Sequence, residues 1–186
     1  MSYYSQEELK KIGFKSIGSD VMISTKSSIY DPEMIEISNN VRIDDFVMLS
    51  GKVIINSYCH ITPYCMLAGG EPGIFLSENV TLAYGVKVFS QSDDYSGHSL
   101  TNSLIPRHFK KEIFKPVNIH KHTIIGANSL IFPGVTIHEG VSVGAMSLVN
   151  KSLNAWTENF GIPVREIKKK SKNILNLWNL FQNEKK

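Results

Sequence analysis

One histidine in this chain lies close in sequence to two carboxylates. His98 follows Asp93 and Asp94 within the polar segment SDDYSGH. An unperturbed histidine has a pKa of roughly 6.5, which suits an imidazole for general base catalysis. One of the aspartates could orient or charge-stabilise the imidazole, as a carboxylate does in a catalytic triad. The segment therefore indicates proton-transfer chemistry. The alternatives are a solvated loop histidine and a polar pair that only stabilises a turn.

Other kinds of catalytic chemistry find less support in the residue pattern. The remaining histidines are His60, His108, His120, His122 and His138, and only His108 shares the segment of His98, as a second candidate base. No HExxH spacing is present. Both cysteines fall at positions of a six-residue repeat whose side chains are expected to point inward, which argues against a zinc site. A nucleophile elbow is also absent, so a covalent enzyme intermediate is disfavoured.

A six-residue repeat surrounds these candidate residues. Aliphatic side chains recur every six residues, at Ile17, Ile23 and Ile29, at Ile37, Ile43, Leu49, Ile55, Ile61 and Leu67, at Leu76, Leu82 and Val88, and at Ile119, Ile125, Ile131, Ile137, Val143 and Val149. This period matches neither an α-helix nor a half-buried strand. It is typical of a β-solenoid, in which three short strands and three turns close one coil and stacked coils bury a continuous apolar column.

The repeat divides the chain into parts of one domain. We expect an N-terminal helical cap over 1–16, first coils over 17–89, an active-site loop over 90–117, last coils over 118–150, and a tail with a C-terminal helix over 151–186. Ser5 and Glu8 predict a capping box for the first helix, and Gly13 predicts its end. The loop has lost the repeat, and long loops inside compact domains are usually functional or disordered.

Composition narrows the remaining classes. The 186 residues are 42% hydrophobic, enough for one sizeable core, and the net charge of +3 is too small to indicate nucleic acid binding. No apolar run approaches the length of a membrane span, and the N-terminal residues carry charges in place of a signal peptide. Two cysteines at inward positions fit a reducing cytoplasm, so we expect a cytoplasmic protein.

The repeat, the stretch IIGANSLIFPGVTIHEGVSVGAMSLVNKSL and the following NFGIPVREIKK resemble the hexapeptide-repeat acyltransferases. The similar group is the sugar acetyltransferases, including galactoside and maltose acetyltransferases and enzymes of surface-polysaccharide synthesis. This resemblance implies an all-β fold, a left-handed parallel β-helix, and a homotrimer with active sites between subunits. It also implies acetyl-CoA as cosubstrate and no metal.

The resemblance assigns roles to particular residues. In galactoside-type members a catalytic histidine follows a glycine, and Gly97 and His98 match that arrangement, so His98 is expected to be the general base. The substrate residues would be Asp93, Asp94, Tyr95 and Asn102: the aspartates could bind sugar hydroxyls, and Tyr95 could stack on a sugar ring. For the coenzyme, the resemblance implies contacts to small residues stacked one coil apart and to two cations: Gly126, Ala127, Gly144, Ala145, Lys151 and Arg165.

These observations lead to one main hypothesis and two alternatives. The main hypothesis is transfer of acetyl to a sugar hydroxyl by direct attack, with His98 as general base, in O-antigen or capsule biosynthesis. The first alternative is N-acetylation of an amino sugar linked to a nucleotide, because a neutral amine needs less help from a base. The second is a non-catalytic solenoid or a metal-dependent one similar to the γ-carbonic anhydrases. Partners would be acetyl-CoA and a sugar or nucleotide-sugar, without nucleic acid, and membrane contact through the C-terminal helix is not favoured.

Overall fold

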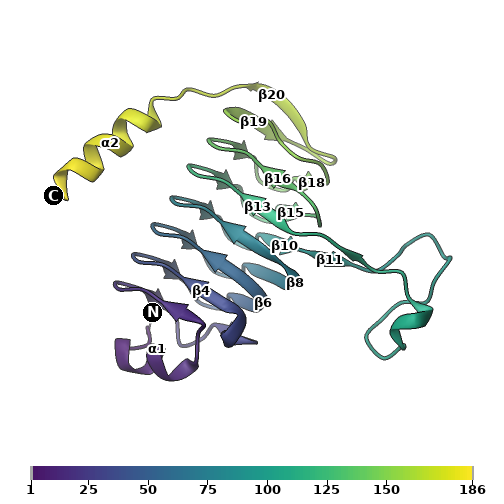
Figure 1. Cartoon of the computed structure of the whole chain (residues 1–186). Helices are drawn as coiled ribbons and strands as arrows, with labels where there is room; N and C mark the ends of the chain where they lie inside the picture. Colours follow the sequence, from purple (N-terminus) through teal and green to yellow (C-terminus); the bar gives the residue numbers. More distant parts are fainter. Residues whose placement is uncertain (1, 186) are drawn as a thin grey trace.

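The structure is a computed structural model that describes residues 2–185. Figure 1 shows short strands stacked in coils, with a helix at each end of the chain and one long arm leaving the stack. The coils form a parallel β-solenoid of about seven turns. The fold class that the six-residue repeat predicts is therefore confirmed.

Three faces make up each coil, and all strands within a face pair in parallel. The first face contains β1 (Ser16–Ile17), β4 (Ile35–Ile37), the ends of β6 (Met48–Ile55) and β8 (Met66–Leu76), β13 (Val117–Ile119) and β16 (Thr136–Ile137). The second face contains β2 (Met22–Ile23), β5 (Arg42–Ile43), β7 (His60–Ile61), β9 (Thr81–Leu82), β14 (Ile124–Ile125), β17 (Ser142–Val143) and β19 (Thr157–Phe160). The third face contains β3 (Ser28–Ile29), the beginnings of β6 and β8, β10 (Lys87–Phe89), β15 (Leu130–Ile131) and β18 (Leu148–Val149).

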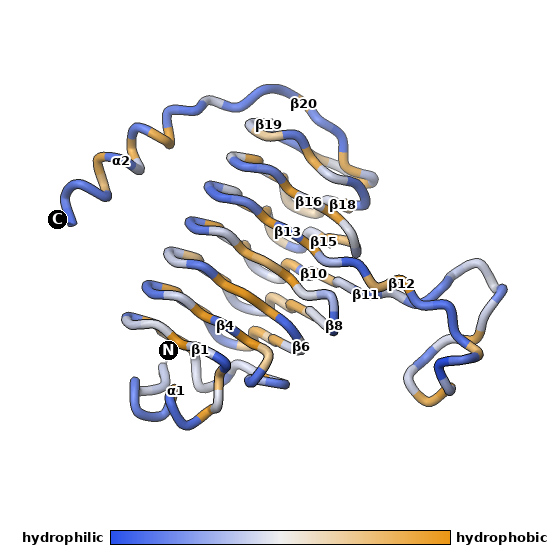
Figure 2. The backbone as a smooth tube through the Cα atoms, in the orientation of Figure 1, coloured by the Kyte–Doolittle hydropathy of each residue, from blue (hydrophilic) through white to orange (hydrophobic). Residues whose placement is uncertain are grey.

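The aliphatic residues of the repeat form the core. Ile43 pairs in register with Ile61, and Ile61 with Leu82, so each coil places its large side chain on that of the coil before. All three of these side chains are fully buried. Figure 2 shows the same alternation along the tube, with apolar positions recurring in each coil between polar corners. Helix α1 (Gln6–Ile12) packs Leu9 into the first coil, and its predicted capping box and end at Gly13 are confirmed.

The predicted loop forms an arm at the corner between the third and first faces. Strand β11 (Gln91–Ser92) pairs antiparallel with β12 (Ile113–Phe114), and the residues between them extend away from the solenoid (Figure 1). A short helix, η2 (Arg107–Phe109), lies in this arm. An earlier coil carries the short helix η1 (Pro32–Met34) at the same corner. Because β10 continues directly into β11, the base of the arm stays beside the third face.

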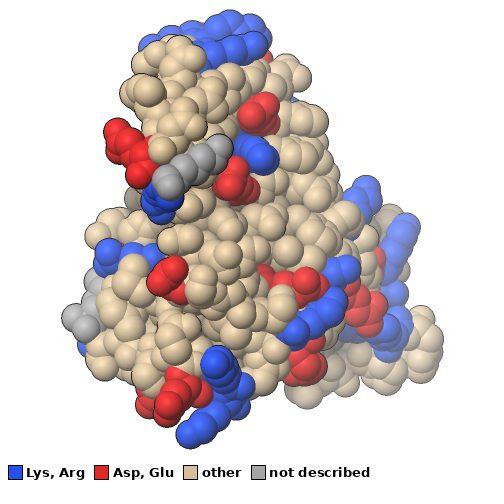
Figure 3. All heavy atoms as spheres, turned by 60° about the vertical axis from the view of Figure 1, so that its left-hand side comes forward, with Lys and Arg blue, Asp and Glu red and all other residues tan. Residues whose placement is uncertain are grey.

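The tail closes the last coil and then returns along the solenoid. Strand β20 (Arg165–Lys169) pairs antiparallel with β19, and Figure 3 shows basic side chains gathered at this end of the molecule. Helix α2 (Ile174–Glu184) confirms the predicted C-terminal helix. Its Trp178 ring contacts the rings of Tyr58 and His122 edge to face, with centroids 5.3 and 5.4 Å away, so the helix packs on its own solenoid. Neither α1 nor α2, the helices within residues 2–185, has the length and apolarity needed to cross a bilayer.

Candidate active site

A pocket of about 490 Å³ lies between the third face and the base of the arm. Its floor is apolar and comes from outward-facing side chains of the solenoid, whereas its polar groups come from the arm. The lining residues are Met48, Met66, Ala68, Phe89, Leu130, Phe132 and Pro133 from the solenoid, and Gln91, Ser92, Asp93, Tyr95 and Glu112 from the arm. Such a pocket suits a ligand with an apolar side and a few polar groups.

The arm supplies two carboxylates to this pocket, and they differ in their partners. Glu112 forms an ion pair with Lys110, with 3.1 Å between Oε1 and Nζ. The carboxylate of Asp93 has no hydrogen bond or ion pair with another side chain in residues 2–185. Asp93 is therefore the carboxylate that remains available to a cationic or hydrogen-bonding group of a ligand.

Asp94 has a different, local role. Its carboxylate accepts hydrogen bonds from the backbone N–H of Ser96 at 3.0 Å and from the hydroxyls of Ser96 and Ser99 at 2.7 and 2.9 Å. The hydrogen bonds from Ser96 and Ser99 lower the pKa of Asp94 below its usual value. Asp94 thus stabilises the turn that opens the arm. The structure separates two neighbouring aspartates that the sequence left equivalent.

The remaining predicted substrate residues lie farther along the arm. Tyr95 lines the pocket, but the residue is 92% exposed. His98 and Asn102 are exposed and do not line the pocket. The Asn102 side chain accepts the N–H of Leu104 at 2.9 Å and so stabilises a turn. Within one chain, the structure brings Asp93 and Tyr95 together and leaves His98 outside the pocket.

The small residues expected to contact the coenzyme stack at the corner between the second and third faces. The Gly126 N–H donates to Val143 O at 2.7 Å, and the Gly144 N–H donates to Asn159 O at 2.8 Å. A Cβ on Gly126 would lie 2.4 Å from Ala145 N, and one on Gly144 would lie 1.8 Å from the Phe160 ring. Tight stacking of the corners therefore requires these glycines, whatever ligand the corner holds. Ala127 and Ala145 occupy the following positions, where Ala127 is half-buried and Ala145 is exposed.

The two predicted phosphate-binding cations lie at different corners. Arg165 pairs with Phe160 in the hairpin of β19 and β20, so it borders the column of small residues. Lys151 follows β18 at the corner between the third and first faces. Both side chains are exposed, and the structure places only Arg165 beside the predicted coenzyme contacts.

Sequence reasoning missed the apolar floor of the pocket. Met48, Met66 and Leu130 each stand one position before an inward aliphatic residue, so the repeat marks them only as outward-facing. They form the floor of a pocket only because the arm covers them. An outward row that is apolar in several successive coils is the signal that could have identified it.

The cysteines and the histidines do not form an alternative centre. Cys59 and Cys65 are free and buried, and burial raises the pKa of the Cys59 thiol to about 12. Within residues 2–185 no group of three or more His, Cys, Asp and Glu side chains is arranged to hold a metal ion.

A six-residue-repeat solenoid with a pocket beneath an inserted arm is typical of the hexapeptide-repeat transferases. No family model matches the chain. The chain is 38% identical to the dTDP-4-amino-4,6-dideoxy-D-glucose acyltransferase of Escherichia coli over 98% of this chain and 96% of that protein. It therefore belongs to the hexapeptide-repeat acyltransferase family that includes this enzyme.

Solved structures agree with this assignment. AntD, an N-acyltransferase from Bacillus cereus, is 51% identical with a TM-score of 0.97 over 98% of each chain, in a variant bound to dTDP-4-amino-4,6-dideoxyglucose and Coenzyme A. AntD bound to dTDP and 3-hydroxybutyryl-CoA is also 51% identical, covering 98% of this chain and 97% of that chain with a TM-score of 0.97. A hexapeptide-repeat acetyltransferase of Vibrio cholerae, at 19% identity and a TM-score of 0.62 over 90% of this chain and 80% of that chain, shares the fold.

The comparisons change the order of the functional hypotheses. They favour the first alternative, N-acylation of a nucleotide-linked amino sugar, over O-acetylation of a sugar hydroxyl. The acyltransferase class itself is the one that the sequence resemblance implied.

Proposed function

We propose that this protein transfers an acyl group from acyl-CoA to the 4-amino group of a dTDP-linked 4-amino-4,6-dideoxy sugar. The observation that carries the proposal is the unpaired carboxylate of Asp93 in the pocket above an apolar floor. A carboxylate there suits an amine, and methionine and leucine side chains suit the methyl group of a 6-deoxy sugar. The ligands of AntD, dTDP-4-amino-4,6-dideoxyglucose and Coenzyme A, support the same pair of substrates.

The chemistry is direct transfer within a ternary complex. The neutral amine attacks the thioester carbonyl, a C–N bond forms, and the C–S bond breaks. The nitrogen loses one proton and the departing CoA thiolate takes up one, so the products are an amide and CoA. Asp93 would hold the amine close to the thioester, which converts a bimolecular step into a local one. With both thiols buried, no cysteine in the chain is placed to carry the acyl group.

The coenzyme would run along the corner of small residues, with Gly126, Ala127, Gly144 and Ala145 allowing close approach to the backbone and Arg165 meeting its phosphates. Lys151 would reach the coenzyme only from the neighbouring corner. A homotrimer with active sites between subunits is part of the proposal, as are a cytoplasmic location and a role in surface-polysaccharide synthesis. In such a trimer, the arm could carry His98 over another subunit's pocket.

The acyl group need not be acetyl. AntD was solved with 3-hydroxybutyryl-CoA, and a pocket of about 490 Å³ leaves room for more than a two-carbon acyl chain beside a sugar. A panel of acetyl-CoA, butyryl-CoA and 3-hydroxybutyryl-CoA would rank the donors.

The test is CoA release with dTDP-4-amino-4,6-dideoxyglucose, measured with a thiol reagent and by the mass of the product. The matched acceptor is the corresponding dTDP-6-deoxyglucose, which carries a hydroxyl at C4. We expect an amide product with the amino sugar and no product with the hydroxyl sugar. Acylation of the hydroxyl sugar at a comparable rate would restore O-acetylation, and no transfer to either would refute the proposal.

Two neighbouring variants test the role of Asp93. A hydrogen bond to a charged group contributes about 1.5–3 kcal/mol, so Asp93→Asn should lower kcat/KM for the amino sugar by about 10- to 150-fold. Asp94→Asn keeps an acceptor oxygen in the turn and should have a much smaller effect. Equal losses in both variants would contradict the assignment of the amine to Asp93.

His98→Ala tests the general base. If His98 accepts the amine proton, turnover should fall while CoA binding is unchanged. Unchanged turnover would remove His98 from the mechanism and leave the thiolate as the proton acceptor.

A further inference from the structure

An exposed aromatic pair borders the pocket, and the function proposed above does not use it. Phe46 and Tyr64 occupy the corner between the second and third faces in successive coils. Their rings stack with centroids 5.0 Å apart and an interplanar angle of 18°. Even so, 49% of Phe46 and 62% of Tyr64 is exposed, so the outer face of the stack is open to solvent.

The left-handed backbone at these two positions does not itself require an aromatic ring. Phe46 has a φ of 61° and Tyr64 a φ of 65°, in the left-handed region that bulky residues rarely adopt. Asn128, at the same corner of a later coil, has a φ of 56° and shows that an ordinary turn residue fits there. Tyr58, an aromatic residue at another corner with a φ of 60°, has its ring covered by α2. Phe46 and Tyr64 lack such a cover within residues 2–185.

The aromatic pair is continuous with the pocket floor. Met48 and Met66, the first residues of β6 and β8, stand two residues after Phe46 and Tyr64, and both line the pocket. Two residues of chain span at most about 7 Å, so a ligand of nucleotide size in the pocket reaches the rings.

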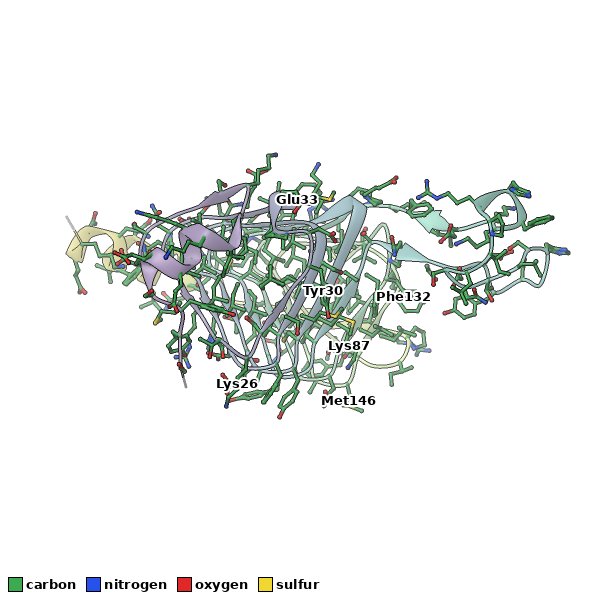
Figure 4. All side chains as sticks on the ribbon, turned by 90° about the horizontal axis from the view of Figure 1, so that it is seen from below. Lys26, Tyr30, Glu33, Lys87, Phe132 and Met146 are labelled. Atoms are coloured by element: carbon green, nitrogen blue, oxygen red, sulfur yellow. The ribbon has the colours of Figure 1, made fainter. Side chains whose placement is uncertain are left out.

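A cation lies in the coil that follows Tyr64, in the outward row that supplies the pocket floor. Lys87 pairs in register with Met66 on one side and Leu130 on the other, in an otherwise apolar stretch of the outward row. Its ammonium group reaches back toward the corner and donates to Gly85 O at 3.2 Å, and no carboxylate of residues 2–185 forms an ion pair with it. Figure 4 shows Lys87 between the corner that carries Lys26 and Met146 and the side chains of Tyr30 and Phe132.

Lys26, beside the Phe46 ring, already has a carboxylate partner. Lys26 lies 5.6 Å from the Phe46 ring centroid and forms an ion pair with Asp45 at 3.3 Å. Lys87, one coil after Tyr64, has no such carboxylate partner within residues 2–185, and its ammonium group suits a group of double negative charge such as a diphosphate.

We propose that the Phe46–Tyr64 stack and Lys87 bind the nucleotide part of the acceptor, with the pyrimidine base on the exposed face of the stack and the diphosphate at Lys87. This inference rests on the proposed function, because it takes the sugar to occupy the pocket beside Asp93. An aromatic side chain stacks on any base by its π-face, and an ammonium group recognises phosphate as a point charge. The nucleotide then extends from the pocket toward the N-terminal coils, away from the corner column of Gly126 and Gly144.

The test is calorimetric binding of dTDP to the full chain and to paired variants. Tyr64→Leu removes the stacking ring and Tyr64→Phe retains it, and both keep an apolar side chain at the corner. We expect Tyr64→Leu to weaken dTDP binding by about 5- to 150-fold, the range that loss of one stacked base produces, and Tyr64→Phe to bind as the wild type does.

Lys87→Gln and Lys87→Arg form the second pair. Lys87→Gln should weaken dTDP binding by about tenfold and reduce its salt dependence, because a cation no longer meets the diphosphate, whereas Lys87→Arg should retain both. Tyr30→Leu is the control, since Tyr30 is an exposed aromatic residue of the first coil that lines no part of the pocket. CoA affinity should be unchanged in all five variants.

Three outcomes would overturn the inference. The first is dTDP binding within twofold of wild type in both Tyr64→Leu and Lys87→Gln, and the second is no dTDP binding by the wild type. The third is a change in the mass of the nucleotide-free assembly in Tyr64→Leu, which would assign the stack to a contact between copies of the chain. If the wild type transfers the acyl group to the amino sugar but the Tyr64 and Lys87 variants bind dTDP as the wild type does, this inference alone is refuted. Variant-sensitive dTDP binding without transfer would refute only the proposed acceptor.

Discussion

Replacing Gly126 by alanine tests whether the small residues at the corner between the second and third faces are required by coil stacking. Gly126 is not in the left-handed region, so its backbone conformation tolerates alanine. The added Cβ, however, would lie 2.4 Å from Ala145 N, 2.6 Å from Gly144 C and 2.8 Å from Ala145 Cα. These are backbone atoms of the next coil, so the two corners must move apart.

The size of the effect follows from that movement. Overpacking of a tight contact costs about 1–3 kcal/mol, and the 2.7 Å hydrogen bond from Gly126 N–H to Val143 O would weaken as the corners separate. Loss of a typical hydrogen bond adds about 0.5–1.5 kcal/mol, so the total is about 1.5–4.5 kcal/mol. For a chain of this size each kcal/mol lowers the Tm by about 2–4 °C, which predicts a fall of about 3–18 °C.

The assay is thermal unfolding followed by circular dichroism, with calorimetric CoA binding on the same samples. Gly97→Ala in the arm is the control: its φ of 80° strains an alanine, but nothing lies within 4 Å of a Cβ there, so the strain stays in the arm, outside the stacked coils. Gly126→Ala with an unchanged Tm and weakened CoA binding would show that the corner has room for a methyl group. In that case the reasoning from coil stacking is wrong, and the glycine serves the coenzyme alone.

Three further predictions concern the core, a buried carboxylate and a thiol. Ile131→Asp places a charge at a fully buried position and should yield unfolded or insoluble protein, whereas Asn150→Asp at an exposed position should fold normally, as solubility and circular dichroism would show. Burial opposes ionisation of Asp44, but hydrogen bonds from Arg42 and His60 outweigh it and lower the pKa of Asp44. The ionised carboxylate therefore stabilises the fold above about pH 4, and this stabilisation is lost as the pH falls. Denaturant unfolding from pH 7 to pH 3 should show that Asp44→Asn is less stable than wild type at pH 7 and has a weaker dependence on acid. With its pKa raised to about 12 by burial, Cys59 should resist a thiol reagent at pH 8 in the folded protein and react after unfolding.

Local patterns account for the part of the structure that could be predicted. Ile43, Ile61 and Leu82 recur at one face because each coil repeats the same short strand and turn, so the period alone determines which residues are inside. Ser5, Glu8 and Gly13 predicted the first helix because capping depends on residues within one turn of each other.

The pocket depends on contacts between distant segments, and the sequence did not predict it. Asp93 and Asp94 are adjacent and chemically identical, yet the Ser96 and Ser99 hydrogen bonds engage only Asp94, and the pairing of β11 with β12 leaves Asp93 beside the third face. His98 resembled a catalytic histidine by its position after Gly97, but its place on the arm leaves it outside the pocket of its own chain.

The sequence by itself determined the repeat, the identity of the buried residues and the acyltransferase resemblance, because a six-residue period requires no knowledge of what lies next to it. Only the tertiary structure decided which outward residues meet. Met48, Met66 and Leu130 come from three coils, and they become one floor because parallel stacking aligns equivalent positions, with successive coils about 5 Å apart. The same stacking puts Phe46 on Tyr64 and Lys87 beside Met66, residues that no local pattern connects.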